Sequence, residues 1–130
     1  MRVLIIDVTA DRIRWLQNSL EAMGHDVRTA SDPKSALDQF RETCFDVAFF
    51  DHDLGVEPNG SRLATMVLES RKCKKPKAVW IHTSNTVGAQ NIASKFHSAN
   101  IPYVIQPYND VIRSPDFRAN VTKLLALVAS

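Results

Sequence analysis

The sequence contains few cysteines, little net charge and no long apolar run, and each shortage excludes a class of protein. Cys44 and Cys73 are the only two cysteines among 130 residues, they lack metal-ligand spacing, and no secretory signal precedes them. We therefore expect a reducing, cytoplasmic setting. The 16 basic and 14 acidic residues nearly cancel, so no general nucleic-acid footprint follows. No apolar run approaches the roughly 20 residues that span a bilayer, so we expect no contact with a membrane.

The sequence does contain short apolar runs that alternate with segments of helical periodicity. Continuous Val, Leu and Ile content is typical of strands that are buried on both faces of a parallel sheet. The five expected strands cover residues 2–7, 26–30, 46–51, 77–83 and 103–106. No repeat, linker or low-complexity segment interrupts them. The pattern predicts one α/β domain over residues 1–130, with a doubly wound sheet of the (βα)5 type.

The segments between these runs carry apolar residues on one face. After the first run, Thr9 is a candidate helix cap, and Gly24 is a candidate stop. Asp32 is a candidate N-cap before the second helix, and Asn59-Gly60 closes a loop and opens the third helix. The last helix is expected after Pro107, capped by Ser114, with an apolar stripe of Val121, Leu124, Leu125 and Val128.

Ionisable and polar residues follow the apolar runs at the point where each strand ends. They are Asp7 after the first strand, Asp51, His52 and Asp53 after the third, His82 to Asn85 after the fourth, and Gln106 after the fifth. In an open parallel sheet, ligands bind beyond the carboxyl ends of the strands, where strand order reverses. The fold and the chemistry therefore indicate the same edge of the sheet.

These residues resemble the receiver domain of two-component response regulators over essentially the whole chain. The resemblance lies in "VLIID", in "DVAFFDHDLG" with a following "NG", and in "YVIQPY". It implies a flavodoxin-like fold with strand order 2-1-3-4-5. It also implies that Asp51 accepts a phosphoryl group, that Asp7, Asp51 and the carbonyl of Asp53 hold Mg²⁺, and that Tyr103 is the switch aromatic.

Three positions depart from the receiver pattern and argue against ordinary phosphorelay. Val8 stands where a receiver has a second acid, so the Mg²⁺ site is weakened, although Asp7 and Asp51 are still suited to a hard cation. Gln106 replaces the lysine that neutralises the phosphoryl group and brings no charge. His82 falls near the place of a serine or threonine, with Thr83 as the alternative if the register slips by one residue.

Two imidazoles beside carboxylates are suited to phosphodiester chemistry, because one can deprotonate a nucleophile while the other protonates the departing oxygen. We therefore take Asp51, His52 and His82 as the catalytic candidates. The ligand-binding candidates are Thr83, Ser84, Asn85 and Gln106. Backbone N–H groups of the helix that starts near Gly88 complete the expected anion site. "DHDL", "HTSN" and "VGA" also resemble motifs of the cyclic-phosphate-processing receiver domains, which implies a cyclic phosphate ligand.

Each candidate also has an ordinary structural interpretation. His82 at the end of a buried strand is compatible with a core histidine bonded to backbone, and Asn85 with a plain helix cap. His52 could be a solvated loop residue. The basic stretch 71–77 is best read as a solvated helix end.

Three functions remain as hypotheses. The preferred one is a sensor of cyclic phosphates, or a phosphoesterase acting on them, at the pocket of acids and histidines. The second is a phosphorelay receiver that is phosphorylated on Asp51. The third is a pseudo-receiver that acts through protein contacts across the face of Tyr103. The expected partners are accordingly a phosphate-containing small molecule, a signalling protein, or both.

Overall fold

Five parallel strands form one sheet in a computed structural model that describes residues 1–129. Their order across the sheet is β2-β1-β3-β4-β5. The strands are β1 (Arg2–Ile6), β2 (Asp26–Ala30), β3 (Val47–Phe50), β4 (Ala78–Ile81) and β5 (Tyr103–Ile105). The three central strands have almost only buried residues, as their continuous apolar content predicts. The flavodoxin-like receiver fold expected from the sequence is confirmed.

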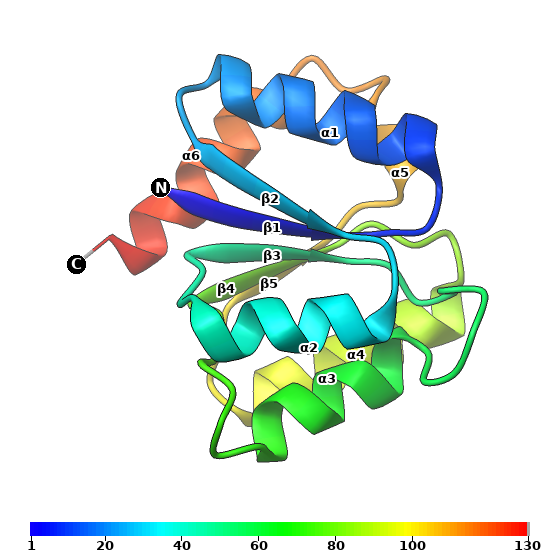
Figure 1. Cartoon of the computed structure of the whole chain (residues 1–130). Coiled ribbons are helices and arrows are strands. Elements are labelled where there is room, and N and C mark those ends of the chain that lie inside the picture. The colour runs from blue at the N-terminus through cyan, green and yellow to red at the C-terminus, as the bar shows by residue number, and fades with distance from the viewer. Residues whose placement is uncertain (130) are drawn as a thin grey trace.

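Helices cover both faces of the sheet. One face carries α1 (Ala10–Ala22), α5 (Tyr108–Val111) and α6 (Phe117–Val128), and the other carries α2 (Pro33–Glu42), α3 (Gly60–Glu69) and α4 (Thr86–Ser98), as Figure 1 shows. Two separate apolar cores result. Helices α1, α5 and α6 pack on Ile5, Phe49 and Trp80. Helices α2, α3 and α4 pack on Ile6, Phe50 and Ile81. This alternation fixes which side each strand-end residue points to.

Side chains cap the starts of α2, α3 and α4. Asp32 accepts a hydrogen bond from the backbone N–H of Ser35, and Asn59 accepts one from Arg62. Thr9 lies at the N-cap position of α1 but makes no capping bond with its side chain. The first N–H groups of α1 therefore have no side-chain partner from this cap.

Two expectations about the C-terminal part were wrong. The short helix α5 follows Pro107 directly, and the sequence pattern did not predict it. The last helix begins at Phe117, and Ser114 accepts a hydrogen bond from the N–H of Asp116, 3.2 Å away, so it bridges a turn and does not cap the helix.

Within residues 1–129, no helix has the length and apolar character needed to cross a membrane.

Candidate functional site

Four polar side chains lie in one row across the carboxyl ends of four strands. The last paired residues of these strands are Ile6, Phe50, Ile81 and Ile105. The residues that follow them are Asp7, Asp51, His82 and Gln106, and we call these four the strand-end row. Their N–H groups continue the sheet ladder onto neighbouring carbonyls at 3.2, 3.1, 3.1 and 3.0 Å. Because side chains alternate along a strand, all four point to the α1 side.

This register settles which residue of the fourth strand occupies the place opposite Asp51. The N–H of His82 donates to the carbonyl of Phe50, so His82 and not Thr83 stands in the strand-end row. Thr83 comes one position later, and its hydroxyl oxygen accepts a bond from the N–H of Asn85, 3.1 Å away. An imidazole therefore occupies the place where the resemblance to receiver domains implies a hydroxyl.

Asp7 is fully buried and accepts four hydrogen bonds. Its Oδ1 accepts from the backbone of Thr9 and from Arg12 Nη2, both at 2.9 Å. Its Oδ2 accepts from Arg12 Nε at 2.9 Å and from His82 Nε2 at 2.8 Å. Burial alone would raise the pKa of Asp7, but the bonds from His82, Arg12 and Thr9 outweigh it and lower that pKa far below its ordinary value. Asp7 is therefore a permanent carboxylate.

Asp51 has a different environment although it lies beside Asp7. Its Oδ1 accepts from the backbone N–H of His52 at 2.8 Å, and its Oδ2 faces Arg12 Nη2 at 3.3 Å. Burial raises the pKa of Asp51, and the neighbouring charge of Asp7 adds to this, while His82 and Arg12 oppose it. The two carboxylates of one pocket are thus shifted in opposite directions, which is common where a site binds or transfers charge.

Arg12 is a member of the site that sequence reasoning missed. It lies in the first turn of α1. Its guanidinium donates to Asp7 through Nε and Nη2, and Nη2 also donates to Asp51. Its side chain is 33% exposed, whereas those of Asp7 and Asp51 are buried. A cation in the first turn of a helix is disfavoured by the helix dipole. That misplaced charge, five residues after a strand-end acid, was the available signal.

His82 forms a buried pair with Asp7. Because a carboxylate accepts, Nε2 of His82 carries the proton when the ring is neutral, and Nδ1 is then a bare acceptor. Nδ1 has no hydrogen-bond partner among the described residues, and neither does Oε1 of Gln106, the next member of the strand-end row. Two buried polar atoms thus remain unpaired at the end of the sheet, which is unusual in folded proteins.

His52 lies on the other face of the sheet. Its Nδ1 is 3.1 Å from Asp53 Oδ1 and 3.3 Å from Asn85 Nδ2, and its ring packs against Gly88 of α4. A Cβ at Gly88 would overlap ring atoms of His52, so this position requires glycine. His52 and His82 share no bonding partner, and the structure does not bring them together as a pair.

The remaining predicted residues serve the start of α4 or lie outside the strand-end row. Asn85 caps α4 by accepting from the N–H of Gly88 at 2.9 Å, so the N–H group expected to bind an anion already has a partner. Ser84 is exposed on the loop before the cap. Asp53 was expected to contribute its backbone carbonyl to a metal site; its side chain is 69% exposed and pairs with His52. Tyr103 is exposed on β5, where its ring packs on His97.

Three members of the strand-end row carry side chains that can ligate a metal ion. Asp7, Asp51 and His82 offer ligand atoms within 4.8 Å of one another, which is close enough for a shared ion. However, both oxygens of Asp7 and Oδ2 of Asp51 already accept bonds from nitrogen donors. A hard divalent ion needs several free oxygen ligands. The residues fit a divalent ion poorly while Arg12 holds this position.

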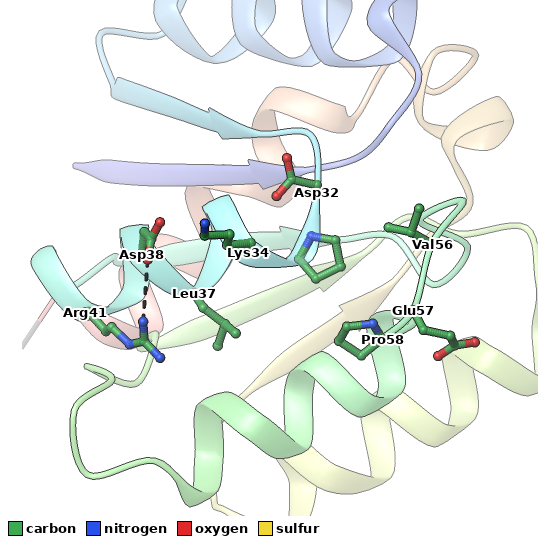
Figure 2. Close-up of a pocket in the computed structure, with 9 residues that line it drawn as sticks. Asp32, Lys34, Leu37, Asp38, Arg41, Val56, Glu57 and Pro58 are labelled. Carbon is green, nitrogen blue, oxygen red and sulfur yellow. Dashed lines mark hydrogen bonds and ion pairs between the residues drawn. The ribbon is translucent and has the colours of Figure 1, made fainter.

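Two hollows lie near the carboxyl edge but do not contain the strand-end row. One of about 480 Å³ opens between α2 and residues 56–58, with side chains of both charges around it, as Figure 2 shows. There Arg41 pairs with Asp38 at 3.5 Å. The other, of about 400 Å³, is lined by His52, Asp53 and Glu57.

Comparison with known families identifies the chain. The model of the cyclic-phosphate processing receiver domain matches residues 7–98, which include the strand-end residues Asp7, Asp51 and His82. The chain belongs to this family. The sequence resemblance to receiver domains is thereby confirmed. No curated protein matches the chain.

Solved structures of response regulators share the fold of this receiver domain. A two-component response regulator from Clostridium difficile is 21% identical with a TM-score of 0.75, over 100% of this chain and 99% of the other. The regulator TrrA from Thermotoga maritima, in complex with Mg²⁺ and BeF, is 20% identical with a TM-score of 0.69, over 95% and 97%. CheY4 from Vibrio cholerae is 18% identical with a TM-score of 0.71, over 95% and 97%. At these identities the likeness extends to the fold.

Proposed function

We propose that this receiver domain binds a cyclic phosphate at the mouth of the strand-end row, with Arg12 as the group that recognises the phosphate. The observation that carries the proposal is the guanidinium of Arg12, which lies over two buried carboxylates and is the charged donor nearest to solvent there. Arginine matches the geometry of phosphate oxygens with parallel N–H donors. It supplies the positive charge that Gln106 does not bring.

The start of α1 supports the same location. Thr9 leaves the first N–H groups of this helix without a side-chain cap, and they lie beside Arg12 at the positive end of the helix dipole. The start of α4, in contrast, is capped by Asn85 and covered by His52. An anion therefore has free donors at α1 and few at α4.

Asp51 can adapt to a bound anion. Its 3.3 Å contact is the longest of the three bonds that Arg12 makes, so a phosphate oxygen can replace it while Arg12 keeps Asp7. Because burial raises the pKa of Asp51, this carboxyl takes up a proton more readily than Asp7. A protonated carboxyl donates a hydrogen bond to a phosphate oxygen.

The geometry favours binding over hydrolysis by two histidines. The general acid and base of that mechanism must both reach one ligand, but His52 and His82 lie on opposite faces of the sheet with separate partners. We therefore assign ligand binding to the Arg12 side and do not assign His52 a proton transfer. Magnesium is not part of the proposal. Phosphorylation of Asp51 and action through a protein partner remain hypotheses from the sequence.

The test is calorimetric titration with nucleoside 2′,3′-cyclic phosphates, with the acyclic monophosphates as competing ligands. We expect Arg12→Ala to weaken binding about tenfold or more, because a hydrogen bond to a charged group contributes about 1.5–3 kcal/mol. The matched control is Arg14→Ala, which removes a charge from the same helix at an exposed pair with Asp11. Equal affinity in the wild type and Arg12→Ala would refute the assignment.

A further inference from the structure

The carboxyl ends of β1 and β3 carry a cation that belongs to the chain itself. Arg12 contacts Asp7 through Nε and Nη2 at 2.9 Å, and Asp51 through Nη2 at 3.3 Å. One guanidinium thus joins the two carboxylates that would otherwise share a divalent ion. We propose that Arg12 takes the place of the divalent cation, and that this receiver domain holds its pocket together without metal.

The occupancy of the carboxylate oxygens supports this inference. Asp7 Oδ1 accepts from Thr9 and Arg12, and its Oδ2 accepts from Arg12 and His82. Asp51 Oδ1 accepts from the backbone of His52. An ion entering between the two acids must displace Arg12 from both. The domain then loses the bidentate hydrogen bonds between Arg12 and Asp7, a pair that is mostly shielded from solvent.

Charge balance gives a second argument. Two ionised carboxylates side by side in a buried site repel each other strongly unless a cation lies between them. The guanidinium provides one permanent positive charge, since arginine does not deprotonate in proteins, and its bond to Asp7 raises the pKa of Arg12 further. Val8, in the place of a second acid, is consistent with this lower requirement, because a monovalent guanidinium needs fewer negative charges than a divalent ion.

Arg12 joins the two carboxylates in the free domain, whether or not a cyclic phosphate is the ligand.

The experiment measures thermal unfolding of the full chain with and without millimolar Mg²⁺. We expect the wild type to show no shift of Tm with Mg²⁺. Arg12→Ala is expected to unfold at a lower temperature and to recover part of the loss when Mg²⁺ is added, because the uncovered carboxylates then form a hard-cation site. Arg14→Ala, which leaves the two acids covered, is expected to respond like the wild type.

A second measurement covers the case in which Arg12→Ala does not fold. Mn²⁺ added to the wild type broadens the amide signals of residues close to a bound ion. We expect no selective broadening at Asp7, Thr9 or Asp51. Selective broadening there would overturn the inference, as would a Mg²⁺-induced rise of Tm in the wild type, or a folded Arg12→Ala variant that does not respond to Mg²⁺.

Discussion

At the scale of single residues, Asp7 and Asp51 behave in opposite ways although they occupy adjacent places in one row. Asp7 accepts four hydrogen bonds and has a lowered pKa, whereas burial raises the pKa of Asp51. The difference arises from position, because Arg12 and His82 both donate to Asp7 and only one long bond reaches Asp51 from Arg12. Ionised Asp7 therefore stabilises the fold, whereas ionised Asp51 destabilises it.

We predict that Asp51→Asn raises the free energy of unfolding at neutral pH, because burial disfavours the ionised carboxyl of Asp51. A carboxyl with a raised pKa in the folded state stabilises the fold below its ordinary value of 3.8, and that contribution is lost as pH rises through the raised pKa. Asparagine still offers Oδ1 to the N–H of His52. Urea unfolding followed as a function of pH measures the effect.

The control is Asp7→Asn, for which the sign is opposite. A lowered pKa contributes stability above the ordinary value of 3.8, which is lost as pH falls below it. At neutral pH we expect a loss of about 3 kcal/mol, because Arg12 and His82 lose a buried charged partner. A neutral or destabilising Asp51→Asn at pH 7, or a gain that persists below pH about 4, would contradict our view of Asp51.

At the scale of elements, the motifs "DHDL", "HTSN" and "VGA" together form one contact between the loop after β3 and the start of α4. Asp51 belongs to the strand-end row, and His52 packs on Gly88. Leu54 is buried in the same apolar core as residues of α3 and α4. Asn85 bonds both the His52 ring and the N–H of Gly88. These motifs therefore position the loop as well as the chemistry.

We predict that Gly88→Ala lowers the free energy of unfolding by about 1–3 kcal/mol, which is the usual cost of overpacking. A Cβ at this position would overlap the ring of His52. The control is the same change in a His52→Ala background, where the space is free. There we expect no loss, or a gain of about 0.5–1 kcal/mol, because alanine favours helix over glycine. Additive effects in this double-mutant cycle would show that the two residues do not interact.

Much of the fold could be predicted at this scale because it depends on local patterns. Apolar runs located the central strands, and β2 was also placed correctly. Asp32 marked one helix start as a cap, and Asn59-Gly60 marked another as the end of a loop. The short helix α5 was missed because four residues are too few to show helical periodicity. The start of α6 was misplaced since Ser114 satisfies a turn and not a helix end.

The candidate site was harder to predict because it depends on which face each strand-end residue points to. The sequence located Asp7, Asp51, His82 and Gln106 at the correct edge, but it could not separate them from His52, which lies one position later on the opposite face. Arg12 was missed because its contact with Asp51 joins residues 39 positions apart. Only the packing of α1 over the strand ends brings them together.

At the scale of the whole molecule, this receiver domain carries a charged pocket on one side of the sheet and a structural histidine on the other. Arg12, Asp7 and His82 form one connected group of hydrogen bonds under α1. Trp15, one turn after Arg12 in α1, packs edge-on against Tyr108 of α5, with ring centroids 6.0 Å apart. A cytoplasmic location and a signalling partner remain predictions from the sequence.

The most direct test of the central claim is an amide NMR titration of the wild type with a nucleoside 2′,3′-cyclic phosphate. We predict that the largest shift changes occur at Thr9 to Arg12 and at Asp51, around the guanidinium and the uncapped start of α1. Smaller changes are expected at Asn85 and Gly88, because the N–H of Gly88 already donates to the side-chain amide oxygen of Asn85. Shift changes confined to the His52 side, or none at all, would contradict phosphate recognition by Arg12.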